Sequence, residues 1–370
     1  MHLVSPHYRL TGLLLALQLT ASISSPVFAA EADQLTLPDE FSLRILSEET
    51  PGARQMALGS NGTLFVGTWR EGNVYAMANA LTATPGKVVS IATGLTMPSG
   101  VTVNQGDLYV AALDRVLRFA DIESNLIHDA PFTVVTATLP DKRHHGWKYI
   151  KFGPDGQLYV PVGAPCNLCE SDDERFASIL RMNPDDGTTT VYAHGVRNSV
   201  GFAWHPRTGQ MWFSDNGRDL MGDDVPPEEI NIVTQPGEHF GYPYVHAADL
   251  LDPEFETGAD PDSYADPVFE IQAHSAALGM TFYTHDAFPP PYRGALFIAE
   301  HGSWNRSSKV GYRVSVITFG AESRYQPFVE GWLQGERDWG RPNDVLVTPA
   351  GSLLISDDKA GAIYEVRPRN

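Results

Sequence analysis

Short apolar stretches separated by turns of Gly, Asn or Asp recur along most of the chain. One copy of this unit contains the turn Asn61-Gly62, and a clearer copy contains the turn Asp155-Gly156. The flanking stretches are a few residues long and rich in β-branched and aromatic side chains, which is typical of strands. Asn-Gly and Asp-Gly tolerate the positive φ of tight hairpin turns. The pattern therefore predicts a chain built from β-hairpins.

Repetition of this unit predicts the architecture. Small sheets that pack radially close into a ring and leave few free edges, so we predict an all-β fold, a six-bladed β-propeller. A pair of β-sandwiches is the alternative, but it would not need six similar units. Residues 41–46 alternate in apolarity and are expected to pair with the last copy and close the ring. Longer spacings predict insertions around 220–275 and 300–340. The copies begin near residues 56, 101, 150, 202, 280 and 345.

The first residues follow a different pattern. Arg9 precedes the short apolar run 10–19, and residues 27–29 supply the small side chains of a cleavage site. The run is shorter than the roughly 20 residues that span a bilayer, although a retained membrane anchor is the alternative. We interpret 1–29 as a signal peptide and 30–370 as the propeller domain. No later stretch is apolar enough to span a membrane, so the mature protein is expected to be periplasmic or secreted.

The charge balance narrows the choice of partner. The sequence has 45 Asp and Glu against 26 Lys and Arg, a formal net charge of −19. Such a surface repels phosphate backbones, which argues against a nucleic acid partner.

Cysteine occurs at two positions, Cys166 and Cys169. One CxxC pair cannot form a four-cysteine zinc site. In an exported protein a local structural disulfide is the simplest interpretation, and a free or redox-active pair is the alternative.

Candidate catalytic residues lie in the loops, where propellers carry their function. His144 and His145 precede the first strand of the third copy. Because an imidazole titrates near neutral pH, it can take a proton from an alcohol. Taken alone, two ordinary loop histidines are the simpler interpretation.

Three further polar segments interrupt the strands. Arg197 offers a planar charged fork for a carboxylate or carbonyl, and Asn198 adds a neutral donor. Residues 214–231 are dense in oxygen ligands and glycines, as in calcium sites, but lack EF-hand spacing, and a merely solvated acidic loop is the alternative. Arg341 leads into the last copy and adds a cation.

Taken in order, these segments resemble the soluble quinoprotein glucose/sorbosone dehydrogenases, which use pyrroloquinoline quinone (PQQ). The resemblance covers about residues 145–366 well and the first two copies loosely. Two stretches, 145–149 and 301–306, look most like the sorbosone dehydrogenase-like branch. The motifs that carry the resemblance are His145 with Gly153-Pro154-Asp155, then 180–183, 194–201, 229–231 with 237–243, and 341–345.

The resemblance implies a role for each matching position. His145 matches the general base that takes the proton of the sugar's anomeric hydroxyl as hydride moves to the quinone. The remaining matches are Arg197 and Asn198 at the quinone, Gly217 and Arg218 as backbone carbonyl ligands of a calcium ion, and Arg341 at the cofactor's carboxylates.

The chain departs from the family pattern at three points. Asn343 stands where the family has a second arginine. The family's quinone-contacting lysine has no clear counterpart, and His301, Arg306 and Lys359 are the nearest candidates. Arg218 stands where the family has proline, which a backbone ligand tolerates.

We therefore predict a sugar dehydrogenase with PQQ and Ca²⁺ as cofactors. It would oxidise an aldose or related sugar and pass electrons to an external acceptor. Aromatic walls for the quinone or the sugar are expected from Trp147, Phe240, Tyr242 and Trp304, with packing between blades as their alternative role. Two other functions stay open. One is a propeller lactonase whose calcium is held by side-chain carboxylates, and the other is a non-catalytic binding propeller.

Overall fold

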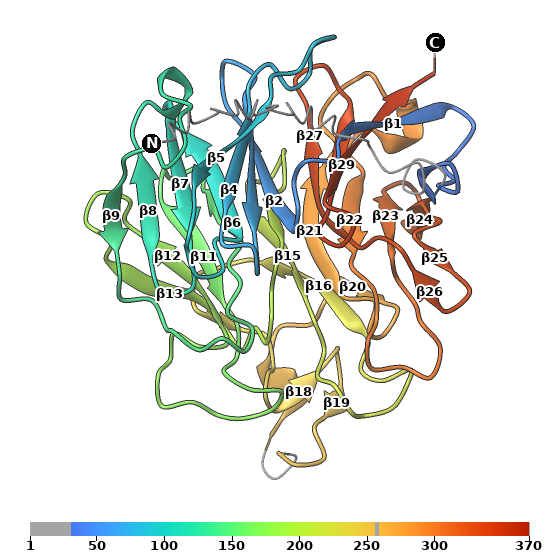
Figure 1. Ribbon diagram of the computed structural model, residues 1–370. Helices are drawn as coiled ribbons and strands as arrows, with labels where there is room; N and C mark the ends of the chain where they lie inside the picture. The colour runs from blue at the N-terminus through green and yellow to red at the C-terminus, as the bar shows by residue number, and fades with distance from the viewer. Residues whose placement is uncertain (1–30, 256–258, 370) are drawn as a thin grey trace, which may run out of the picture.

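The structure is a computed structural model that describes residues 31–255 and 259–369. Figure 1 shows six small antiparallel sheets arranged around a common centre, which confirms the six-bladed β-propeller. In each blade the chain starts at the innermost strand and moves outward. The predicted signal peptide lies outside the described residues. No helix among the described residues is long and apolar enough to cross a membrane.

The first three blades are formed by consecutive stretches of chain. Blade 1 consists of β2 (Ala53–Leu58), β3 (Leu64–Thr68), β4 (Val74–Met77) and β5 (Val88–Ala92). Blade 2 consists of β6 (Gly100–Asn104), β7 (Asp107–Ala111), β8 (Val116–Phe119) and β9 (Thr133–Thr136). Blade 3 consists of β10 (Lys151–Phe152), β11 (Leu158–Val162), β12 (Ser178–Met182) and β13 (Thr189–His194), with β17 (Glu238–His239) added in parallel to β13.

The last three blades contain longer connections. Blade 4 consists of β14 (Phe202–Trp204), β15 (Met211–Asp215), β16 (Glu228–Val233) and β20 (Phe269–Ile271). Blade 5 consists of β21 (Ala277–Phe282), β22 (Leu296–Glu300), β23 (Arg313–Thr318) and β24 (Arg324–Val329). Blade 6 consists of β27 (Pro342–Val347), β28 (Leu353–Asp357), β29 (Ala362–Pro368) and β1 (Phe41–Ser47).

Two small hairpins and three short 3-10 helices complete the described fold. The first hairpin, at the bottom of Figure 1, pairs β18 (Val245–His246) with β19 (Leu250–Leu251). The second pairs β25 (Leu333–Gln334) with β26 (Arg337–Asp338). The 3-10 helices are η1 (Ile122–Ser124), η2 (Pro261–Ser263) and η3 (Pro290–Tyr292).

The segments predicted as insertions are in part blade strands. The region 220–275 holds β16 and β20 of blade 4, and the region 300–340 holds β23 and β24 of blade 5. The outer strands escaped the sequence pattern because they bury fewer side chains. In β24, for example, only the last two residues are buried.

The apolar core lies between the blades. The described residues form six buried clusters, and each contains side chains from two consecutive blades. Each sheet therefore buries both faces against its neighbours, which explains the nearly continuous apolar runs of the inner strands. No blade can bury its faces alone.

Ring closure joins the two ends of the chain. β1 pairs antiparallel with β29, with Phe41 opposite Pro368 and Leu43 opposite Val366, as the alternation of 41–46 predicted. Phe41 is fully buried, and its ring lies 4.6 Å from that of Phe288 and 5.0 Å from that of Phe328. The closing strand thus completes blade 6 and also packs against blade 5.

Phe41→Ala should lower the free energy of unfolding by about 3–5 kcal/mol, because it deletes a fully buried aromatic side chain from this junction. Chemical denaturation would measure the change. Ser42→Ala on the exposed face of the same strand is the control and should stay within about 0.5 kcal/mol of the parent. An equal effect of the two substitutions would contradict the role given to β1.

Candidate active site

The blade geometry brings two kinds of loop to one end of the ring. Within an antiparallel blade, the connection that leads into the inner strand and the connection between the second and third strands lie at the same end. This is the end at the bottom of Figure 1, from which β18 and β19 project. The residues described below come almost entirely from these two kinds of connection.

A cavity of about 250 Å³ lies where these loops meet. It is lined by cationic, acidic and aromatic side chains from blades 1, 4 and 5 and from the connections that lead into blades 3, 4, 5 and 6. Its wall is formed by Arg54, Trp69, His145, Trp147, Arg197, Asn198, Asn216, Gly217, Asp219, Glu228, His274, Ala276, Leu278, His301, Gly302, Trp304 and Arg341.

His145 lies on the cavity wall with its ring orientation fixed. Its Nδ1 is 3.0 Å from the carbonyl oxygen of Ala164. A carbonyl oxygen only accepts, so Nδ1 carries the hydrogen and Nε2 keeps its lone pair. The backbone of His145 has φ 48°, a conformation that side-chain-bearing residues rarely adopt. A Cβ on Gly163 would lie 2.5 Å from the Cβ of His145, so this close approach requires glycine at position 163.

The surroundings of His145 keep its ring neutral. Burial lowers the pKa of His145 well below 6.5, and the nearby charges of Arg197, His144 and Lys148 lower it further. The hydrogen bond to Ala164 opposes these effects but does not cancel them. The ring is therefore an unprotonated base at neutral pH.

Arg197 and Asn198 form a turn whose backbone N–H groups are bound by one carboxylate. Asp215 accepts the backbone N–H of Arg197 at 2.7 Å and that of Asn198 at 2.6 Å. Burial, and then the charge of Glu229, raise the pKa of Asp215 to about 8. The side-chain oxygen of Asn198 accepts the Trp147 indole N–H at 3.1 Å and so orients that ring.

A group of oxygen atoms lines the cavity beside this turn. Gly217 donates its backbone N–H to Glu228 at 3.0 Å, and burial raises the pKa of Glu228 to about 8. The Asp219 carboxylate lies on the same wall. The Arg218 side chain pairs with Asp252 at 2.6 Å, and Arg218 is not among the residues that line the cavity. In residues 31–255 and 259–369, no group of three or more His, Cys, Asp and Glu is arranged to hold a metal ion.

The opposite wall carries two arginines in a linked network. Arg341 donates to the carbonyl oxygens of His301 at 3.0 Å and Gly302 at 2.7 Å. The His301 ring contacts Asp358 at 2.9 Å, and Asp358 accepts from Arg54 at 2.9 Å. Burial lowers the pKa of His301 to about 4. Burial would raise the pKa of Asp358, but its contacts with His301 and Arg54 lower that pKa to about 2.

Arg54 was not among the site residues predicted from the sequence. It lies in β2, its guanidinium is 5.6 Å from the rings of Trp69 and Trp147, and its Nε has no partner among the described residues. A charged residue inside the first apolar stretch was the one available signal, since buried arginines need partners.

Three predicted cofactor residues do not line the cavity. Asn343 is buried in β27 with its amide nitrogen unpaired among the described residues. Arg306 has a largely buried side chain and pairs with the exposed Asp224 at 2.9 Å. Lys359 pairs with Asp338 at 2.6 Å and lines an adjoining cleft of about 340 Å³.

Of the four predicted aromatic residues, two line the cavity and two do not. Trp147 and Trp304 line the cavity, and Trp304 is 73% exposed at its rim. Phe240 packs against Phe213 between blades, and Tyr242 is buried beside the disulfide that the structure places between the two cysteines.

Fold and cavity together define a propeller with a polar, aromatic-lined loop site at one end of its ring. The sequence profile named "Glucose / Sorbosone dehydrogenase" matches residues 114–364. The chain therefore belongs to the glucose/sorbosone dehydrogenase family.

Known proteins similar to this chain include one close in sequence and several close in structure. An uncharacterized protein of Borreliella burgdorferi is 34% identical over 363 residues, covering 93% of this chain and 94% of the relative. The calcium structure of a Trichoderma reesei enzyme of carbohydrate-active family AA12 has a TM-score of 0.74 at 18% identity, covering 90% of this chain and 97% of that one. The holo pyranose dehydrogenase PQQ domain of Coprinopsis cinerea has a TM-score of 0.72 at 16% identity, with 90% and 97% covered. At these identities the structures show a shared fold.

Asp358→Asn should lower the free energy of unfolding at pH 7 by on the order of 3 kcal/mol, because it leaves the buried Arg54 charge without its partner. A carboxylate whose pKa is lowered by folding stabilises the fold above its unfolded pKa, near 4, and loses that effect as pH falls toward about 2. The difference from the parent should therefore be constant from pH 7 to about 4.5 and shrink below it.

Chemical denaturation across this pH range would measure the difference. Asp286→Asn is the matched control, because the Asp286 side chain is 91% exposed. A difference for Asp358→Asn that grows as pH falls would contradict the ion-pair assignment.

Proposed function

We propose that the protein is a PQQ-dependent sugar dehydrogenase that oxidises an aldose or related sugar at this cavity. One observation carries the proposal within the family. The neutral His145 ring lies on the same wall as Arg197 and Asn198, and its free lone pair is on Nε2. A base, a fixed cation and an amide are thus placed around one small volume, as general-base oxidation of an alcohol requires.

The cavity suits a flat anionic cofactor. Arg54, Arg197 and Arg341 give it three permanent cations in an otherwise acidic protein. Trp147 and Trp304 supply flat apolar surfaces for a ring system. The orphaned Nε of Arg54 is a donor available to a carboxylate. These features support a quinone tricarboxylate as the ligand.

Oxygen atoms near Gly217 suit a calcium ion. Calcium prefers six to eight oxygen ligands, including backbone carbonyls. The backbones of Gly217 and Arg218 would provide carbonyl ligands, and the carboxylates of Asp219 and Glu228 lie on the same wall. Because the side chains alone do not complete a metal site, cofactor oxygens would supply the remaining ligands.

Each of these side chains would have its own role in the oxidation. A bound quinone would supply the two-electron oxidant for the sugar carbon. His145 Nε2 takes the proton of the hydroxyl on that carbon, and the carbonyl of Ala164 stabilises the resulting imidazolium through the Nδ1 hydrogen. Arg197 and Asn198 would contact the quinone, and Trp304 at the rim offers a surface for the sugar ring.

The proposal also covers the type of sugar, the electron acceptor and the location of the enzyme. The sugar would be of the type taken by the sorbosone-like branch, electrons would leave to an external acceptor, and the site of action would be periplasmic or extracellular. The similar Coprinopsis cinerea domain is described as a pyranose dehydrogenase PQQ domain in holo form, which supports the choice of cofactor and substrate class. No observation favours the lactonase. Its calcium would need a cluster of side-chain ligands, and the described residues contain no such cluster of His, Cys, Asp and Glu.

Reconstitution with PQQ and CaCl₂ should produce dye-linked oxidation of aldoses. His145→Gln should lower kcat by about 10²–10⁴-fold, the usual contribution of a general base. His144→Gln is the matched control, because His144 is exposed and does not line the cavity, and it should change kcat by no more than a few-fold. Full turnover in His145→Gln would show that another residue is the base, and inactivity of the parent on all sugars would contradict the proposed function.

His145 should titrate well below pH 6.5 in the cofactor-free protein. Because its pKa is lowered, the ring stays unprotonated, and so competent as a base, as pH falls through 6.5. NMR of ¹³Cε1-labelled histidines would follow this titration, with His145→Gln used to assign the signal. A midpoint at or above 6.5 would contradict the burial and charge argument.

A further inference from the structure

The connection between β11 and β12 carries a four-residue loop closed by the disulfide between Cys166 and Cys169. We propose that this loop is a positioning element for Arg197, in which Asn167 holds the guanidinium and the disulfide holds Asn167. The proposal concerns the geometry of the protein itself. Its consequence for quinone binding rests on the function proposed above.

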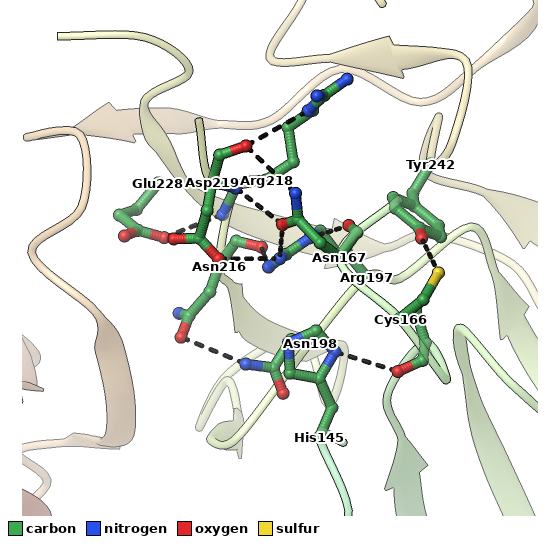
Figure 2. A network of polar contacts seen from close by, with 12 residues as sticks. His145, Cys166, Asn167, Arg197, Asn198, Asn216, Arg218, Asp219, Glu228 and Tyr242 are labelled. Carbon is green, nitrogen blue, oxygen red and sulfur yellow. Dashed lines mark hydrogen bonds and ion pairs between the residues drawn. The ribbon is translucent and has the colours of Figure 1, made fainter. Parts of the chain in front are cut away.

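Asn167 makes four polar contacts across the boundary between blades 3 and 4 (Figure 2). Its backbone carbonyl accepts from Arg197 Nε at 3.0 Å, and its side-chain oxygen accepts from Arg197 Nη2 at 2.7 Å. The same side-chain oxygen accepts the Asp219 N–H at 2.9 Å, and its amide donates to the Asp219 carbonyl at 3.1 Å. One residue therefore fixes both the arginine and the neighbouring acidic loop.

The remaining contacts of Arg197 do not replace this pair. Nη1 donates to the Asn216 carbonyl at 2.9 Å, and Nη2 lies 3.4 Å from the Asp219 carboxylate. These two contacts lie on one side of the guanidinium and leave Nε without a partner. Since Arg197 is buried, loss of Asn167 would leave donors unpaired and favour rotation of the fork.

The disulfide fixes the loop that presents Asn167. This segment follows β11 directly and has no ladder partner of its own. Tyr242 anchors it through its hydroxyl, which accepts the Cys169 N–H at 2.9 Å and lies 3.7 Å from the Cys166 sulfur. Four acidic residues follow, at Glu170 and 172–174. Asp173 pairs with Arg175 at 2.6 Å, and repulsion among the three others, which are exposed, opposes a compact loop. The cross-link restricts the conformations that this repulsion would otherwise favour.

A double-mutant cycle tests whether Asn167 acts through Arg197. PQQ affinity in the presence of Ca²⁺ would be measured by quenching of tryptophan fluorescence for the parent, Asn167→Ala, Arg197→Ala and the double variant. Asn167→Ala should raise Kd by roughly ten-fold in the parent and have no further effect in the Arg197→Ala background. An equal rise of Kd in both backgrounds would overturn the proposal.

Matched variants separate positioning from general destabilisation. Asn183→Ala is the control, because Asn183 caps a turn of the same blade at the end far from the cavity, and its Kd should equal that of the parent. Asn167→Asp keeps the side-chain acceptor and should keep Arg197 in place. A shift of Arg197 in Asn167→Asp as large as in Asn167→Ala would count against the contact.

The disulfide has its own test. Dithiothreitol supplies two electrons and two protons and converts the bond to two thiols. Because it also reduces quinones, it would be removed before PQQ is added. Reduced parent protein and Cys166→Ser/Cys169→Ser should then show the same raised Kd. The double serine variant should not respond to dithiothreitol. An unchanged Kd after verified reduction would show that the disulfide does not position Asn167.

Crystal structures of the cofactor-free parent and Asn167→Ala provide a readout that needs no quinone. The Arg197 guanidinium should leave its position in the variant, whereas an unmoved guanidinium would overturn the positioning role. Failure of the parent to bind PQQ would instead refute the proposed function, so the two failures are distinguishable.

Discussion

The site depends on the closure of the ring by β1 against β29. Each blade buries its two faces against its neighbours, and the described core clusters all span two blades. The cavity wall comes from loops of blades that are far apart in the chain, such as Arg54 in β2 and Arg341 before β27. These loops meet only because blade 6 is completed by the strand that precedes blade 1, so the same contacts stabilise the fold and assemble the site.

Buried charge is the second constraint, and it follows from the first. Arg54 and Arg197 are almost fully buried, and the Asp358 side chain is 10% exposed. Such charges persist only when partners compensate their lost hydration. Most of these partners come from other loops, so the network fixes the relative positions of neighbouring blades. Burial, and then the charge of Arg197, keep His145 neutral. Arg197 therefore adds a cation to the cavity and also helps to hold His145 as an unprotonated base.

The sequence predicted the fold well because repetition needs no long-range information. The turns Asn61-Gly62 and Asp155-Gly156 identify blades locally, whereas outer strands such as β24 bury few side chains and leave no pattern. For the site, position along the chain placed His145, Arg197 and Arg341 in loops, and the structure brings these three residues to one cavity. Arg54 and Asn167 were missed because their roles depend on neighbours from other blades. Arg306 and Lys359 lie near the site in sequence, but their side chains pair with Asp224 and Asp338 outside the cavity.

We propose above all that this cavity holds one quinone beside His145. The most direct test is a titration of cofactor-free protein with PQQ at saturating Ca²⁺, followed by the absorption spectrum of the quinone. We expect a saturable spectral change with one quinone per chain, retained in His145→Gln and weakened in Arg197→Ala. A spectrum identical to that of free quinone at all protein concentrations would contradict it.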